Sequence, residues 1–190
     1  MKSIALFTIC LLFSTSTFSQ NRTDIIRKEF VLGFSTGIAN SNLNFPSKNQ
    51  NSTNLALNWK VGYMLNPKFA IVLNGAVSNY EYDLSDRKRL RDFGGVFASA
   101  QFFVKEKWWI LGGVGVGTDA PVFYDLKPEN KVETKYYSGL GAVSSIGYEI
   151  FRRKNYSLDL QARINYSSVP LPIGKTNGFT SAFLIGINFY

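Results

Sequence analysis

The last stretch of the sequence, GFTSAFLIGINFY at residues 178–190, decides the fold that we predict for the whole chain. Its large apolar side chains fall mostly at alternate positions, namely Phe179, Phe183, Ile185, Ile187 and Phe189. Small and polar residues, such as Thr180 and Asn188, occupy most of the positions between them. Successive side chains of a strand point to opposite sides, so this alternation predicts a β-strand with one apolar face. A strand of this kind needs partner strands elsewhere in the chain.

Seven other segments carry a similar alternation, and together with residues 178–190 they predict eight strands. The other seven are residues 30–38, 55–65, 69–82, 93–104, 108–118, 136–150 and 156–167. Residues 55–65 show the clearest pattern, with leucine and aromatic side chains opposite alanine, asparagine and lysine. Residues 93–104 are less clear, because several phenylalanines compete for one face. For that strand we expect Val96, Ala98, Ala100 and Phe102 to face outward.

The connectors between the predicted strands alternate between short and long. Three short ones lie near Asn66, Glu106 and Arg153, and four longer ones cover residues 40–54, 83–92, 119–135 and 168–177. A transmembrane β-barrel has short periplasmic turns and longer extracellular loops, and an even number of strands returns both chain ends to the periplasm. The sequence therefore predicts an all-β fold, an eight-stranded antiparallel up-and-down transmembrane β-barrel. The alternative is a soluble barrel of the lipocalin type, which would turn its apolar face inward.

The faces opposite the apolar ones carry polar and charged side chains. In a membrane barrel these side chains would fill the interior, because eight strands enclose only enough space for side chains. We expect an interior polar network formed by Asn58, Lys60, Asn74, Glu149, Asp159, Gln161, Arg163 and Asn165.

Aromatic residues gather near the ends of the predicted strands, where membrane barrels carry aromatic girdles. Beside the short connectors, the predicted girdle consists of Tyr63, Phe69, Trp108, Tyr148, Tyr156 and Phe189. A second group beside the long connectors consists of Tyr82, Phe93, Tyr136 and Tyr166. Two such groups at opposite ends favour the membrane barrel over the soluble one.

The N-terminal residues have the pattern of a cleaved secretory signal. Lys2 supplies a positive charge, residues 4–13 are apolar, and small residues lead to an expected cleavage site near Ser19 and Gln20. The only cysteine, Cys10, would leave with this signal, so we expect a mature chain without a thiol. We therefore divide the chain into a signal peptide (1–19), a short periplasmic segment (20–28) and the barrel (29–190).

The signal sequence, the eight alternating segments, the connector rhythm and the terminal Phe189-Tyr190 resemble the small eight-stranded outer-membrane β-barrels of Gram-negative bacteria (OmpA/OmpX-like). The resemblance implies a location in the cell outer membrane, with contacts to its lipid and to the barrel-assembly machinery through the C-terminal strand. It implies a role in envelope structure or surface interaction, with an unidentified surface protein or glycan as partner. Narrow porin-like transport of small solutes and secreted soluble ligand binding are the alternatives.

The densest basic run of the chain contains Arg87, Lys88, Arg89 and Arg91. It is either a solvated loop tip or a group of candidate contacts to lipid phosphates, which guanidinium groups bind in pairs of hydrogen bonds. The net charge of +8 would also suit nucleic acid. The run is short and the expected location is outside the cytoplasm, so we expect no nucleic-acid partner.

The composition argues against catalysis. The chain has no histidine and one cysteine, which excludes Ser-His-Asp and Cys-His nucleophiles and the common imidazole metal sites from the mature protein. Asp119, Asp125, Glu129 and Glu133 could still supply a carboxylate pair. Residues 115–120 match a dinucleotide-binding fingerprint, but Pro121 opposes the helix that this fingerprint requires. We predict a protein that is not an enzyme and needs no cofactor and no metal.

Overall fold

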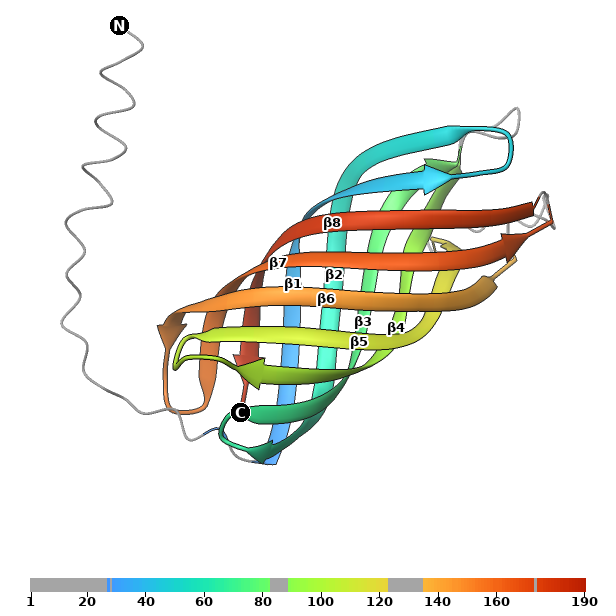
Figure 1. Ribbon diagram of the computed structural model, residues 1–190. Coiled ribbons are helices and arrows are strands. Elements are labelled where there is room, and N and C mark those ends of the chain that lie inside the picture. The colour runs from blue at the N-terminus through green and yellow to red at the C-terminus, as the bar shows by residue number, and fades with distance from the viewer. Residues whose placement is uncertain (1–26, 28, 83–88, 123–134, 173) are drawn as a thin grey trace, which may run out of the picture.

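The computed structural model describes residues 27, 29–82, 89–122, 135–172 and 174–190 (Figure 1). The described residues form eight strands: β1 (Glu29–Asn44), β2 (Asn49–Asn66), β3 (Phe69–Tyr82), β4 (Arg89–Phe103), β5 (Trp108–Pro121), β6 (Tyr137–Arg152), β7 (Tyr156–Leu171) and β8 (Gly174–Phe189). Each strand pairs antiparallel with the next, and β8 returns to pair with β1. The predicted all-β, eight-stranded antiparallel barrel is confirmed. In the part of the chain that the structure describes, no helix is long and apolar enough to cross a membrane.

The barrel closes where β8 pairs with β1. The pairing runs from Leu32 opposite Phe189 to Asn44 opposite Asn177. It uses the backbone hydrogen-bonding groups of both strands, so neither remains as an open sheet edge. The stretch at residues 178–190 therefore supplies both an apolar outer face and the closing strand.

The outer wall of the barrel is apolar. Leu140 and Phe183 have the largest exposed fractions among the large apolar side chains, 81% and 78%. We call the following outward side chains the apolar band: Phe34, Ile38, Leu55, Leu57, Trp59, Ile71, Leu73, Val96, Phe102, Ile110, Val114, Val116, Leu140, Ile146, Leu160, Ile164, Phe183 and Ile185. A soluble barrel would bury such a face, whereas a transmembrane barrel turns it toward lipid.

The two ends of the barrel differ. Residues 67–68, 104–107 and 153–155 make tight connections at one end, which we call the short-turn end. The hairpins β1–β2 and β7–β8 turn at the opposite end, the hairpin end, as Figure 1 shows. Tyr190 follows β8 at the short-turn end.

Two of the four predicted long connectors are wrong. The strands β1 and β2 continue to Asn44 and Asn49, and β7 and β8 continue to Leu171 and Gly174, so only short turns remain between them. These extensions carry polar residues on much of their outer faces, so the sequence lacks the apolar contrast that marks a strand. Backbone pairing does not need that contrast, and the ladder continues. The other two long connectors are shortened at one end each, by β4, which begins at Arg89, and by β5, which ends at Pro121. Their centres lie outside the described residues.

The uncertain fourth strand has the predicted facing. Val96, Ala98, Ala100 and Phe102 are exposed, and Phe97 is fully buried. The same alternation buries Phe93, which we had expected in the outer aromatic group beside the long connectors. Phe93 lies four residues before Phe97 on an uninterrupted strand, so both point inward.

Candidate functional site: the barrel interior and its two ends

The eight polar residues of the predicted network all lie inside the barrel and are buried. They come from four strands, with Asn58 and Lys60 on β2, Asn74 on β3, Glu149 on β6, and Asp159, Gln161, Arg163 and Asn165 on β7. Their side chains form layers along the barrel axis that hydrogen bonds through Asn188 and Ser35 connect. The layers are described from the short-turn end upward.

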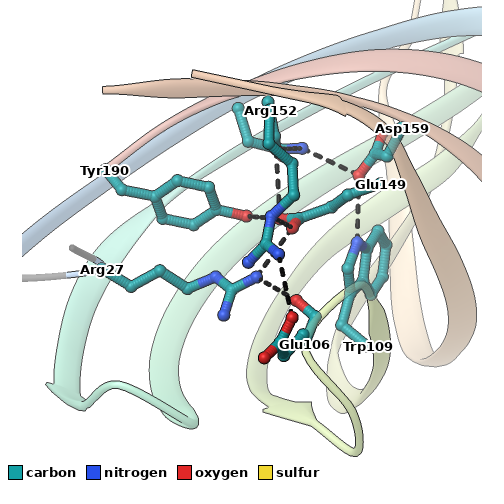
Figure 2. A network of polar contacts seen from close by, with 9 residues as sticks. Arg27, Glu106, Trp109, Glu149, Arg152, Asp159 and Tyr190 are labelled. Carbon is teal, nitrogen blue, oxygen red and sulfur yellow. Dashed lines mark hydrogen bonds and ion pairs between the residues drawn. The ribbon is translucent and has the colours of Figure 1, made fainter. Parts of the chain in front are cut away.

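Glu149 organises the layer at the short-turn end (Figure 2). Its carboxylate is fully buried. One oxygen, Oε2, lies 2.7 Å from Nη2 of Arg27 and 3.0 Å from Nε of Arg152. The other, Oε1, accepts hydrogen bonds from Ser157 at 3.1 Å and from the phenol of Tyr190 at 2.9 Å. Both oxygens therefore have two partners each, which offsets the cost of burying the charge.

Arg27 closes the short-turn end from below. Its Nη2 atom also donates to the backbone carbonyl of Glu106 at 2.6 Å. Its guanidinium lies 3.7 Å from the centre of the Phe103 ring, a cation–π distance. Arg27 belongs to the segment at residues 20–28, which the sequence predicts to be a short periplasmic segment. A single arginine before the first strand carries no pattern that would have identified it.

Asp159 organises the next layer. Its Oδ2 atom accepts from the indole of Trp109 at 3.0 Å and from Asn188 at 2.8 Å, and its Oδ1 atom accepts from Gln161 at 2.8 Å. The ring of Trp109 also lies under the ammonium of Lys60, 4.5 Å from Nζ.

Lys60 itself has neutral partners. It donates to Gln101 Oε1 at 2.9 Å and lies over the Trp109 ring. This ammonium therefore contacts an amide oxygen and an aromatic face. Gln101 and Trp109 point inward from β4 and β5, two strands that contribute no residue to the predicted network.

The third layer is built around Arg163. Its Nε atom donates to Ser145 at 3.0 Å, and its Nη1 atom donates to Asn58 Oδ1. Asn58 in turn donates to Ser35 at 2.9 Å. On the neighbouring strand β3, Asn74 donates to Ser99 of β4 at 2.6 Å.

A buried ion pair lies at the hairpin end of the interior. Arg91 Nε lies 2.6 Å from Asp119 Oδ1, and Tyr80 donates its phenol to Asp119 Oδ2 at 2.8 Å. Arg91 also donates to the backbone carbonyl of Lys135 at 3.1 Å. Buried apolar side chains pack in the same region, namely Leu43, Phe45, Phe93 and Val169.

The expected lipid contact of Arg91 is wrong. Only 3% of this residue is exposed. Arg91 lies an even number of residues before Phe93 and Phe97 on the same strand, so all three side chains point inward. Inside, the buried carboxylate of Asp119 pairs with the arginine. Arg87 and Lys88 lie outside the described residues, and the side chain of Arg89 is not described.

The predicted girdle residues lie on the outer wall near the short-turn end. Trp108 and Tyr148 are cross-strand neighbours with ring centres 4.9 Å apart, and Tyr156 and Phe189 are neighbours at 6.4 Å. Tyr63 is exposed, and Phe69 is partly buried at the start of β3. In the second group, Tyr136 and Tyr166 are exposed near the hairpin end, and the side chain of Tyr82 is not described.

Two sequence features that could have indicated catalysis, the dinucleotide fingerprint and the group of carboxylates, do not form such sites in the described residues. Residues 115–120, the dinucleotide fingerprint, belong to β5. Asp119 is held by Arg91 and Tyr80, while Asp125, Glu129 and Glu133 lie outside the described residues. Within the described ranges, no three His, Cys, Asp or Glu residues gather as metal ligands would.

Comparison with known proteins gives matches among solved structures. A scan against protein-family models and a search of curated proteins find no match. Ail, the attachment invasion locus protein of Yersinia pestis, superposes with a TM-score of 0.56 at 18% identity, over 85% of this chain and 99% of Ail. Ail in complex with the heparin analogue sucrose octasulfate gives 0.55, with the same identity and coverage.

Neisserial surface protein A (NspA) is similar as well. Its TM-score is 0.54 at 15% identity, over 84% of this chain and 96% of NspA. At identities this low, the likeness shows a shared fold alone. The closed eight-stranded barrel, the outward apolar band and these superpositions all indicate the same fold. The chain has the fold of the small eight-stranded outer-membrane β-barrels.

Proposed function

We propose that this protein is a non-enzymatic outer-membrane barrel that acts in envelope structure or surface interaction. The observation that carries the proposal is the filled interior under an apolar outer wall. Lys60, Gln101, Trp109 and Asp159 contact one another across the barrel, with Arg27 below them and the Arg91–Asp119 pair above. Such a barrel would hold the segments of its hairpin end at the membrane surface.

The filled interior argues against the alternative of porin-like transport. One interior cavity, beside Asn58, Arg163 and Thr180, has a volume of about 10 Å³, which is about the space of one water molecule. A hydrated solute would need several of the interior hydrogen bonds to break. The soluble ligand-binding alternative is disfavoured by the outward apolar band, which water would have to solvate.

The orientation follows from the two ends. The short-turn end, with Arg27 and Tyr190, would face the periplasm, and the hairpin end would face outward. The signal at residues 1–19 would direct export, with cleavage near Ser19 and Gln20. The closing strand β8 would be the segment that the barrel-assembly machinery binds. The girdle beside the short turns supports a membrane interface at this end, because aromatic side chains favour that interface.

The hairpin end supports a role in surface interaction. The strands β1 and β2 run beyond the apolar band from Asn40 to Thr53 and turn at residues 45–48. Ail, which has the same fold, is an attachment invasion locus protein and forms a complex with a heparin analogue. A surface protein or a glycan is therefore the partner class that we propose for this barrel, with no nucleic-acid partner.

Two measurements test the proposal. Expressed in a Gram-negative host, the protein should fractionate with the outer membrane and migrate differently on gels before and after heating, as folded barrels do. Recovery as a freely soluble periplasmic protein would contradict the membrane placement. Reconstituted in planar bilayers, it should give no steady, sizeable conductance. Regular open-channel currents would favour transport instead.

A further inference from the structure

Above the apolar band, the outer wall on β2, β1, β8 and β7 carries mainly uncharged polar and aromatic side chains. The register of β2, β1, β8 and β7 arranges them in three rows that cross all four strands. The rows are Asn49, Asn44 and Asn177; Asn51, Asn42, Phe179 and Tyr166; and Thr53, Asn40 and Ser181. On β7 the first row ends at the buried Ser168, and the third ends at Ile164 of the apolar band. We call this surface the amide face. It lies on the extended part of the β1–β2 hairpin and on β8 and β7 beside it (Figure 1).

The amides on β1 and β2 hold one another in place. Asn40 donates to Asn51 Oδ1 at 2.9 Å and to Thr53 at 2.8 Å, and Asn51 donates to Asn42 Oδ1 at 2.6 Å. Asn42 donates to Asn40 Oδ1 at 3.2 Å. These bonds fix the amide planes before a ligand arrives, which lowers the entropy cost of binding. An exposed amide has two donor hydrogens and two acceptor lone pairs, so capacity for a ligand remains on Asn42.

The amide face carries no charge. The chain has 21 basic and 13 acidic residues, yet none occupies a position in the three rows. The next charged residue along β8 is Lys175, two positions beyond Asn177. Phosphate and sulfate groups are bound by arginine and lysine. A surface of amides and hydroxyls instead suits a ligand with many hydroxyl groups and no net charge.

Two aromatic side chains lie in the middle row. Phe179 and Tyr166 are direct cross-strand partners, and 44% and 45% of them are exposed. Tyr166 donates its phenol to Asn177 Oδ1 at 3.1 Å, which ties the aromatic pair to the amides. A sugar ring presents polarised C–H groups on its faces and hydroxyl groups at its edge. The C–H groups pack on the negative face of an aromatic ring, and the hydroxyl groups pair with amides.

The position of the amide face relative to the apolar band indicates which kind of molecule carries the sugar. The row directly below it contains Leu55, Ile38 and Phe183, which belong to the apolar band. On β2, β1 and β8 the amide face therefore begins where the lipid-facing wall ends, at the level of lipid headgroups. On β7 the apolar band reaches one row higher, to Ile164. We infer that it binds the neutral sugar headgroup of a glycolipid in the leaflet around the hairpin end. This inference rests on the proposed membrane placement and extends it to a ligand class.

The test compares two phenylalanines on one strand. The folded protein is reconstituted in nanodiscs of phosphatidylcholine with a small fraction of digalactosyl diacylglycerol, a neutral glycolipid. Native mass spectrometry then measures the enrichment of glycolipid among retained lipids. We expect enrichment for the wild type, reduced about 3- to 10-fold in Phe179→Ala, the range expected for loss of an aromatic contact. Phe183→Ala, four residues along on the apolar band, should keep the wild-type enrichment.

A second pair of variants tests the amides. Asn42→Ala should reduce the enrichment, whereas Asn155→Ala, the same change at a short turn, should leave it unchanged. Heat-modifiable migration of each variant checks that the barrel is folded. No enrichment in the wild type, or equal losses in Phe179→Ala and Phe183→Ala, would overturn the inference.

The outcomes separate the inference from the proposed function. Failure to insert into any bilayer contradicts the membrane placement itself. Insertion without sugar enrichment contradicts the inference alone. Two further results would also overturn it by assigning the face to another occupant. One is preferential retention of an anionic phospholipid, and the other is disulfide-linked dimer formation by Asn42→Cys in a bilayer.

Discussion

Tyr190 donates a hydrogen bond of 2.9 Å from its phenol to Oε1 of Glu149. Tyr190 follows the closing strand β8, and Arg27, which precedes β1, reaches the other oxygen of the same carboxylate. The two sides of the β8–β1 seam are therefore joined through β6, in addition to their own backbone ladder. Burial raises the pKa of the Tyr190 phenol well above its ordinary value, and the Glu149 carboxylate adds to the effect. The phenol of Tyr190 therefore stays protonated and donates its hydrogen bond to Glu149.

Glu149→Gln should weaken the barrel strongly, because it removes the charge that Arg27 and Arg152 share. Breaking a buried ion pair by removing one partner costs about 3–5 kcal/mol. Unfolding by urea in lipid vesicles measures the loss. Glu106→Gln is the matched control, since this carboxylate is 83% exposed and 3.8 Å from Arg152. It should cost about 0–1 kcal/mol. Equal effects of the two changes would mean that Glu149 does not organise the short-turn end.

Tyr190→Phe separates the hydrogen bond from the aromatic ring. A hydrogen bond to a charged group contributes about 1.5–3 kcal/mol, so the free energy of unfolding should fall by that amount. The ring stays in contact with Phe103, at 6.1 Å between centres. Assembly in cells should be preserved, because the last residue is still aromatic. A variant that is stable when refolded but missing from the outer membrane would show that the hydroxyl group acts in assembly instead.

Arg91→Leu should destabilise the hairpin end by about 3–5 kcal/mol, because it leaves the fully buried Asp119 without its cation. The double variant Arg91→Leu with Asp119→Leu should recover most of the loss, since buried ion pairs are often replaced by apolar side chains without cost. Unfolding of the single and double variants measures the recovery. If the double variant is as unstable as the single one, or if Arg91→Leu is harmless, the ion pair does not stabilise this end.

The sequence predicted the strands well where one face is apolar. The pattern of Leu55, Leu57 and Trp59 could be read because the alternate positions are small or polar. Beyond the apolar band this contrast disappears, so Asn40 to Thr53 resembled a loop although its backbone continues the ladder.

The contacts inside the barrel could not be predicted in the same way. Alternation indicates that Glu149 and Asp159 face inward, but it does not identify their partners. Arg27 and Glu149 are 122 residues apart in the chain, and only barrel closure brings them together. Phe93 and Arg91 were misassigned because we judged them by their closeness to a long connector. Both residues lie an even number of positions from the inward-facing Phe97 on the same strand, and that alternation predicts their burial correctly.

Leu73→Arg tests the outer wall directly. Leu73 lies near the middle of the outward face of β3, 45% exposed, between Val61 on β2 and Ala98 on β4. Arginine at the middle of a bilayer costs about 2–4 kcal/mol on the lipid face of a barrel, and the cost falls to about 0–1 near the interface. Leu90→Arg is the matched control, because Leu90 lies at the hairpin end of β4, opposite Glu81 and beyond the apolar band. Folding free energies in lipid vesicles should therefore show a large loss at Leu73 and a small one at Leu90. Losses that are equal, or absent at both positions, would mean that the apolar band does not face lipid.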